Sequence, residues 1–241
     1  MNMIRVWIRK ALNKAGYDIL RLPANPAARQ RLRLMRDRGI NVVFDVGANT
    51  GQYAESLRAL GYRGKIVSFE PLPDAYRELA AKAARDPLWE AVQTAVGDQC
   101  GEITLNVAKN SYSSSALEML PAHRQSAPDT EYTAQIGVSV LTIDSVFDRY
   151  RKDGQKAMLK SDTQGFEYKV IAGCERSLSQ LDCIQMELSL APLYRDETLA
   201  TELISLLRSH GFRLLTLESG HYNYTTGEIL QVEGFFARIM E

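Results

Sequence analysis

The sequence predicts an α/β fold, in which a mostly parallel β-sheet is covered by helices on both faces. Short apolar runs alternate with amphipathic stretches from residue 40 onward, which is the rhythm of β-α-β units. The clearest unit begins at residues 42–46, where Val42, Val43 and Val46 favour a strand that is buried on both faces. With 241 residues, 45% of them hydrophobic and 24% charged, the chain can fold as one domain of ordinary size.

A turn of small residues joins this strand to the next predicted helix. Residues 47–51 read Gly-Ala-Asn-Thr-Gly, and apolar residues follow at helical spacing. The glycines let a ligand approach the backbone, and the start of the helix offers free N–H groups. The pattern from Asp45 is Asp-x-Gly-x-x-x-Gly, not the G-x-G-x-x-G of a dinucleotide site. S-adenosylmethionine (SAM) carries no phosphate, and its sulfonium and amino acid end need a close backbone and an acid such as Asp45.

Acidic residues also end the next two predicted strands. Glu70 closes the strand at residues 65–70, roughly 20 residues beyond the turn, where a ribose-binding carboxylate is expected. Asp98 follows the strand at residues 91–96 and could contact the adenine amino group. Because parallel strands bring their carboxyl ends to one edge of the sheet, these acids and Asp45 predict a SAM site at that edge.

Two other classes of protein are weighed against this pattern. An NAD-dependent oxidoreductase shares the β-α-β start, but the glycine pattern is missing and there is no Tyr-x-x-x-Lys or similar pair for hydride transfer. A non-catalytic protein of the same fold, serving as a subunit, would not need Asp45, Gly47, Gly51 and Glu70 to be intact. Both classes are therefore disfavoured.

The remaining elements follow in order along the chain. Residues 109–137 show no periodicity and hold a serine-rich stretch, so we expect a lid over the acceptor site. An apolar run at residues 138–143 leads into a helix that ends near Tyr150. Further helices are expected at residues 27–38, 73–85, 165–173 and 198–210, and further strands at 102–108, 156–161, 182–190, 212–217 and 229–239.

The first 38 residues form a basic extension to the predicted domain at residues 39–241. They hold ten Lys and Arg against two Asp, a net charge of +8, although the whole chain is neutral. Residues 3–20 place Trp7 and other apolar side chains on one helical stripe flanked by Arg and Lys. Such a helix can lie on an anionic membrane surface. It can equally pack on the domain or on a second subunit, as in a homodimer.

Composition restricts the partners and the compartment. The neutral net charge disfavours nucleic acid as a partner. The three cysteines are widely spaced and without a metal-ligand pattern, as expected for reduced thiols. No apolar run is long enough to cross a membrane, and the N-terminus lacks the pattern of a signal peptide. We therefore expect a cytoplasmic protein with peripheral contact at the inner membrane face.

Five segments resemble the FkbM-type SAM-dependent methyltransferase family: residues 44–51, 69–71, 96–98, 141–144 and 159–167. The last contains the family's Lys-x-Asp-x-x-Gly-x-Glu signature, with Ser161 where an apolar residue is usual. The resemblance runs from about residue 40 to the C-terminus. It implies a Rossmann-like SAM-methyltransferase fold, whose seven-stranded, mostly parallel sheet has the order 3-2-1-4-5-7-6 with strand 7 antiparallel. The predicted elements fit this order, with the N-terminal helical extension added.

The residue pattern and the resemblance together define the expected site. Cofactor contacts are expected at the turn, the strand ends and the lid, from Asp45, Gly47, Asn49, Thr50, Gly51, Tyr53, Glu70, Pro71, Gly97, Asp98, Ser114 and Asp162. Acceptor contacts are expected from Tyr112, Ser113, Ser115, Gln164, Glu167 and Tyr222. The resemblance implies a hydroxyl of a sugar, glycan or natural product as the acceptor, and the basic N-terminus favours a glycan made at a membrane.

Methyl transfer to oxygen is an in-line displacement, so the enzyme must align the hydroxyl with the methyl group and remove its proton. Asp162, at the tip of the fourth core strand, is the first candidate for the base. Glu187, His221 and Lys160 are further catalytic candidates, with Lys160 as the partner of an acid. Asp162, Glu167 and Glu187 could instead bind Mg²⁺ through oxygen. Alternatively, the same carboxylates could have structural roles, as helix caps or as members of salt bridges.

Overall fold

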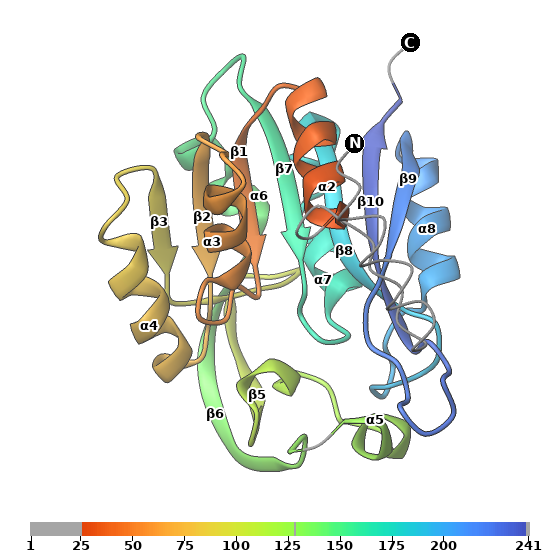
Figure 1. The fold of residues 1–241 in the computed structure, drawn as a ribbon. Coiled ribbons are helices and arrows are strands. Elements are labelled where there is room, and N and C mark those ends of the chain that lie inside the picture. The colour runs from red at the N-terminus through yellow and green to blue at the C-terminus, as the bar shows by residue number, and fades with distance from the viewer. Residues whose placement is uncertain (1–25, 128, 240–241) are drawn as a thin grey trace, which may run out of the picture.

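The computed structural model describes residues 26–127 and 129–239, and its larger sheet has seven strands (Figure 1). These strands are β1 (Ile40–Val46), β2 (Lys65–Phe69), β3 (Trp89–Val92), β7 (Lys156–Ser161), β8 (Leu181–Ser189), β9 (Phe212–Ser219) and β10 (Gln231–Arg238). Their order is β3-β2-β1-β7-β8-β10-β9, and only β10 is antiparallel to its neighbours among the described strands of this sheet. Numbered along the chain within this sheet, the order is 3-2-1-4-5-7-6, so the predicted topology is confirmed.

Helices cover both faces of this sheet. They are α2 (Pro26–Asp37), α3 (Gln52–Ala59), α4 (Pro73–Ala83), α6 (Ile143–Tyr150), α7 (Glu167–Ala172) and α8 (Ala200–Ser209). Apolar residues of α2, α3 and α4 pack in one core cluster with Val43, Ile66 and Met158. Those of α6, α7 and α8 pack in the other, with Phe44 and Leu159. Because β1 faces a core on each side, its residues are apolar almost without alternation, as the sequence predicted.

A second, three-stranded sheet lies beyond the carboxyl ends of the parallel strands (Figure 1). It consists of β4 (Ala95–Val96), β6 (Tyr132–Leu141) and β5 (Gly101–Ala108), with β6 in the middle. The prediction of one strand at residues 91–96 was therefore wrong. The chain leaves the large sheet after Val92 and pairs with β6 from Ala95 onward, and the Thr94 hydroxyl between them donates to the backbone oxygen of Ser139.

The predicted lid is more regular than its sequence suggested. It contains a short 3₁₀ turn, η1 (Ser111–Ser113), the helix α5 (Pro121–Ser126) and the first half of β6. Most of the side chains in that half of β6 are exposed, so they give no apolar periodicity, yet the strand pairs with β5 over its length. We refer to residues 109–127 as the strap.

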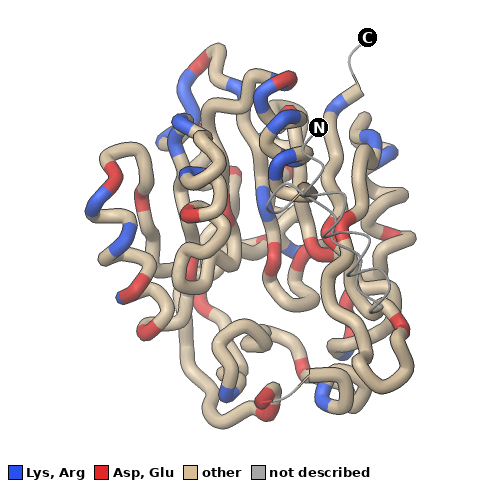
Figure 2. The backbone as a smooth tube through the Cα atoms, viewed as in Figure 1, with Lys and Arg blue, Asp and Glu red and all other residues tan. Residues whose placement is uncertain are grey.

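The N-terminal extension is described only in part. The helix α2 confirms the predicted helix at residues 27–38, whereas the amphipathic segment at residues 3–20 lies outside the described residues. Four arginines, Arg29, Arg31, Arg33 and Arg36, lie on α2, at the end of the molecule away from the small sheet (Figure 2). Over residues 26–127 and 129–239, the structure has no helix of the length and apolarity that a membrane span requires.

We expect the replacement Phe44→Ala to destabilise the protein by about 3–5 kcal/mol, because it removes a large buried ring. Phe44 is fully buried, and its ring stacks on Phe147 with the centroids 5.4 Å apart. Urea unfolding measures the change. Leu217→Ala, at an apolar side chain of β9 that is 56% exposed, is the control and should change stability by no more than about 0.5 kcal/mol. Equal losses for the two variants would contradict the assignment of this core.

Candidate active site

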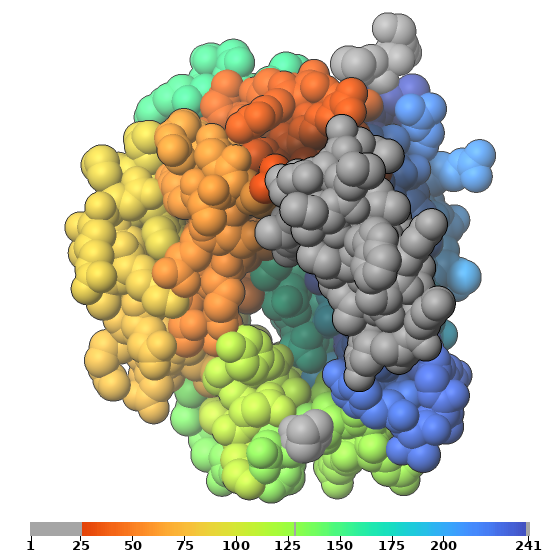
Figure 3. Space-filling view, viewed as in Figure 1, coloured from red at the N-terminus to blue at the C-terminus, as the bar shows by residue number. Residues whose placement is uncertain are grey.

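A cavity lies between the carboxyl ends of the parallel strands and the small sheet. Its empty volume, including the space that opens to solvent, is about 670 Å³. Its polar wall includes Asn49, Glu70, Ser111, Ser114, Asp162 and Gln164, and its apolar wall includes Phe69, Leu72, Val96, Ile103, Leu105 and Phe166. The space-filling view shows a hollow between α3, the strap and the segment after β7 (Figure 3).

The turn after β1 forms one rim of the cavity. Gly47 has a φ of 69°, and a Cβ atom there would lie 1.8 Å from the backbone oxygen of Asp162. Only glycine therefore lets the turns after β1 and β7 come this close. The N–H groups of Gly47 and Ala48 both donate to the backbone oxygen of Phe69 at 3.1 Å, which ties this turn to the end of β2.

Glu70, directly after β2, presents a carboxylate to the cavity. Its two oxygens accept hydrogen bonds from the backbone N–H groups of Asn49 and Leu72, each at 2.8 Å. Burial raises the pKa of Glu70 to about 7, although both hydrogen bonds act in the opposite direction. Each oxygen can accept a second hydrogen bond. This carboxylate therefore fits a pair of ribose hydroxyls, and the apolar wall next to it fits a flat base such as adenine.

Lys160 connects the acids of β1 and β7. Its ammonium lies 3.4 Å from Oδ1 of Asp45 and 3.7 Å from Oδ2 of Asp162, and it donates to the backbone oxygen of Gly47 at 3.1 Å. Burial lowers the pKa of Lys160, but the charges of Asp162 and Asp45 outweigh this effect and keep it raised. Asp45 is fully buried, accepts a hydrogen bond from Ser68 and does not line the cavity. It therefore meets Lys160 and not the ligand space.

Asp162 and Gln164 line the cavity, and Glu187 lies behind Gln164. The side-chain nitrogen of Gln164 donates to Oδ1 of Asp162 at 2.9 Å and to Oε2 of Glu187 at 2.8 Å. Burial raises the pKa of Glu187 well above its usual value, and the charge of Asp162 raises it further. The structure thus brings together three of the predicted residues, with Asp162 as the carboxylate next to the open space.

Glu167 has a different environment from the one the sequence suggested. It accepts hydrogen bonds from the backbone N–H and the hydroxyl of Thr163 and from the backbone N–H of Gly165, so it braces the loop after β7. The prediction that Asp162, Glu167 and Glu187 could share Mg²⁺ does not hold, because loop donors occupy Glu167 and the Gln164 amide lies between the other two. In the described part of the chain no group of three or more His, Cys, Asp or Glu residues could hold a metal ion.

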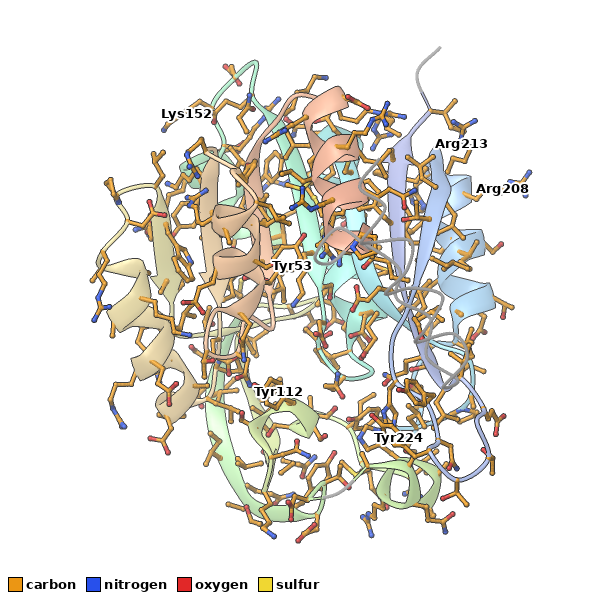
Figure 4. All side chains as sticks on the ribbon, viewed as in Figure 1. Tyr53, Tyr112, Lys152, Arg208, Arg213 and Tyr224 are labelled. Atoms are coloured by element: carbon orange, nitrogen blue, oxygen red, sulfur yellow. The ribbon has the colours of Figure 1, made fainter. Side chains whose placement is uncertain are left out.

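Several other predicted residues lie near the cavity without lining it. Asp98 forms an ion pair with Lys169 at 2.7 Å, and the backbone of residues 94–96 lines the cavity in place of Gly97 and Asp98. Tyr53, labelled in Figure 4, reaches from α3 to β8, where its hydroxyl donates to Gln185 at 2.8 Å. Thr50 and Gly51 also lie outside the lining, whereas Gly47, Asn49, Pro71 and Ser114 belong to it.

The strap closes over the turn after β1. The Asn49 side chain donates to the hydroxyl of Ser111 at 3.0 Å, and the Gln52 side chain donates to that of Tyr112 at 2.8 Å. Tyr112 and Ser114 line the cavity, as does Ser111, which we did not predict although it begins the serine-rich stretch. Ser113 and Ser115 are buried, and Ser115 donates to the backbone oxygen of Gln164 at 2.6 Å. These two serines therefore hold the site together and do not face it.

The two histidines of the predicted lid and C-terminal loop lie next to each other. The rings of His123 and His221 are 5.7 Å apart, and His221 bonds to the hydroxyl of Ser126 at 2.8 Å. Burial lowers the pKa of His123 to about 4, and burial also lowers that of His221. Neither histidine lines the cavity, and the same holds for Tyr222, whose ring packs on that of Tyr224. The position of His221 outside the cavity lining and its lowered pKa therefore do not suit a general base.

The strand order, the glycine turn and the buried acid after β2 define a class of protein, the methyltransferases with a Rossmann-like fold. Residues 45–214 match the family model described as the methyltransferase FkbM domain, which is more than half of the chain. The chain belongs to this family, and it is a SAM-dependent methyltransferase.

The chain is similar to several known methyltransferases. The 31-O-demethyl-FK506 methyltransferase FkbM of Streptomyces tacrolimicus is 28% identical, over 73% of this chain and 74% of that protein. Two solved structures are similar at lower identity. The 1,6-didemethyltoxoflavin-N1-methyltransferase of Burkholderia thailandensis, with S-adenosylhomocysteine bound, is 14% identical, covering 90% and 80% of the two chains with a TM-score of 0.44. The CcbJ methyltransferase of Streptomyces caelestis is 11% identical, covering 89% and 96%, also with a TM-score of 0.44. The fold assignment rests on the strand order and not on these two structures.

We expect the affinity for SAM to fall as the pH is lowered through 7. The pKa of Glu70 is raised to about 7 in the folded protein, and only its ionised form accepts hydrogen bonds from both ribose hydroxyls. Affinity should be constant above pH 7 and weaken below it by up to about tenfold per pH unit. Calorimetric titration with S-adenosylhomocysteine from pH 5.5 to 8.5 measures this. Glu70→Gln should bind S-adenosylhomocysteine weakly, with an affinity that does not change with pH. If the affinity of this variant still falls below pH 7 as it does in the wild type, Glu70 is not the cause of the pH dependence.

Proposed function

We propose that the protein transfers the methyl group of SAM to a hydroxyl oxygen of a sugar, a glycan or a hydroxylated natural product. The observation that carries this proposal is the position of Asp162, which shares one cavity with Glu70 and is backed by Lys160 and Gln164. When bound, SAM supplies an electrophilic methyl group. Glu70 would accept from its ribose hydroxyls, and the turn at residues 47–49 would meet its amino acid end.

Asp162 is the residue that we assign to the base. Its side chain is 36% exposed, while the side chain of Lys160 beside it is 6% exposed, so the carboxylate can meet an incoming hydroxyl. One oxygen accepts from Gln164 and the other faces the Lys160 ammonium at 3.7 Å. This arrangement holds the carboxylate in one orientation, in which it can accept the proton that the hydroxyl loses.

The chemistry of the cavity supports a polar acceptor. Ser111 and Ser114 supply hydroxyl groups in the cavity that Asp162 also lines, and these suit an acceptor with several hydroxyls. A hydroxyl of a natural product is the second candidate, because the relative from Streptomyces tacrolimicus is named for the 31-O position of FK506. Methylation assays on nucleotide sugars, lipid-linked glycans and macrolides, with mass-spectrometric detection of the methyl ether, separate the two.

We expect Asp162→Asn to lower kcat by about 10²–10⁴-fold, because an amide cannot take the proton of the acceptor. The affinity for S-adenosylhomocysteine should change by less than about threefold, since Glu70 and the apolar wall stay intact. Single-turnover methyl transfer and calorimetry measure the two quantities. Asp74→Asn, on the exposed face of α4, is the matched control and should leave both unchanged. Full activity of the Asp162 variant would exclude it as the base.

We also propose that the basic N-terminal segment brings the enzyme to an anionic membrane, where lipid-linked acceptors are found. The support is its sequence alone, the charge of +8 over residues 1–38 and the apolar stripe at residues 3–20. Deleting residues 1–22 should abolish binding to liposomes that contain anionic lipid, and it should leave the turnover of a soluble acceptor unchanged. Co-sedimentation measures binding. Unchanged binding would refute the proposal, and a shift from dimer to monomer in light scattering would support the subunit contact instead.

A further inference from the structure

Gln164 is held on three sides in the wall of the cavity. Its side-chain nitrogen donates to Asp162 and Glu187, and its side-chain oxygen accepts from the hydroxyl of Tyr194 at 2.8 Å. Its backbone oxygen accepts from Ser115, and its φ of 55° lies in the left-handed region, which costs a non-glycine residue conformational energy. The network therefore fixes both the backbone and the amide of this residue.

We propose that Tyr194 is a positioning residue for methyl transfer: its hydroxyl orients the Gln164 amide so that the amide nitrogen holds the Asp162 carboxylate in the orientation that meets the acceptor hydroxyl. This inference rests on the proposed function, because Asp162 is the base there. Tyr194 touches neither the cavity nor the expected reactants, so it acts through Gln164.

The orientation of the amide depends on the Tyr194 hydroxyl. With the amide nitrogen towards Asp162 and Glu187, its two N–H groups each donate to a side-chain oxygen of one of these acids. In the reversed orientation the Asp162 carboxylate would face an acceptor in place of a donor, which is unfavourable. A donor on the opposite side favours the first orientation, and Tyr194 remains a donor, because burial and the charge of Glu187 raise its pKa well above the usual value.

Tyr194 is itself held firmly between the body of the protein and the strap. Its side chain is 1% exposed, and its backbone N–H donates to Glu197 at 2.9 Å. The loop around it pairs with the strap, where Leu120 donates to the backbone oxygen of Leu193 and Arg195 to that of Glu118, both at 2.8 Å.

The signature glycine of the loop after β7 packs directly against this tyrosine. A Cβ atom on Gly165 would lie 3.1 Å from a ring carbon of Tyr194, so the absence of a side chain there leaves room for the ring. The position of the phenol is therefore determined by the fold before any acceptor arrives.

Replacing Tyr194 by Phe removes one oxygen atom and keeps the ring. Without the donor, the Gln164 amide can turn, and the Asp162 carboxylate is no longer held towards the acceptor. We expect kcat to fall about tenfold, because the base is misplaced. The KM for the acceptor and the affinity for S-adenosylhomocysteine should stay within about twofold.

Tyr132→Phe is the matched control. Tyr132 packs in the same small apolar cluster, but its hydroxyl donates to the backbone oxygen of Leu117 at 2.8 Å and not to the side chain of Gln164. This variant should leave kcat and KM unchanged. A Gln164→Ala background supplies a double-mutant cycle, in which Tyr194→Phe should have no further effect on kcat.

A second readout separates this inference from the proposed function. The side-chain amide ¹H–¹⁵N NMR signals of Gln164, assigned from Gln164→Ala, report the orientation of this amide without any acceptor. Tyr194→Phe should shift these signals, and Tyr132→Phe should not. Unchanged signals, or a loss of thermal stability with unchanged kcat and KM, would overturn the role of Tyr194. Absence of methyl transfer to every hydroxyl acceptor in the wild type, with the signals still shifted in Tyr194→Phe, would count against the proposed function alone.

Discussion

The ammonium of Lys160 lies buried between the carboxylates of Asp45 and Asp162, beneath the turn that follows β1. Burying a charged ammonium group is costly unless hydrogen bonds and opposite charges compensate for it. Here the Gly47 carbonyl accepts a hydrogen bond from Lys160, and the two acids supply the opposite charge. Removing Lys160 would leave Asp45 buried and unpaired. The spacing between the turns after β1 and β7, and with it the rim of the cavity, therefore depends on this one side chain.

Around this ion pair the site is assembled from segments far apart in the sequence. The end of β2 supplies Glu70, the loop after β7 supplies Asp162 and Gln164, and the strap closes from the other side through Ser111. Hydrogen bonds between these segments orient each polar group before a ligand binds, which is how enzymes gain rate from preorganised electrostatics. The acids differ in position: Asp45 and Glu167, which do not line the cavity, hold the framework, and Glu70 and Asp162 at the cavity wall are placed to meet ligands.

The sequence predicted the strands of the large sheet and the two acids that line the cavity, Glu70 and Asp162, because strand ends and apolar runs leave a local signal. The order of these strands came from the family resemblance. The sequence did not show in which direction an acid at a strand end points. Asp45 and Asp98 have the same kind of position in the chain, yet one faces Lys160 and the other Lys169.

Of the small sheet, only the strand at residues 102–108 was predicted, and it is observed as β5. The first half of β6 was missed because most of its side chains are exposed. Partners such as Tyr194 come from loops without any periodic pattern.

The central claim is that the cavity beside Glu70 binds SAM and no dinucleotide. Calorimetric titration of the wild type and of Glu70→Ala with S-adenosylhomocysteine and with NAD tests it most directly, with circular dichroism to confirm that the variant is folded. We predict that the wild type binds S-adenosylhomocysteine and not NAD, and that Glu70→Ala weakens this binding by at least about tenfold. Binding of NAD, or equal binding of S-adenosylhomocysteine by both proteins, would contradict the assignment of the site.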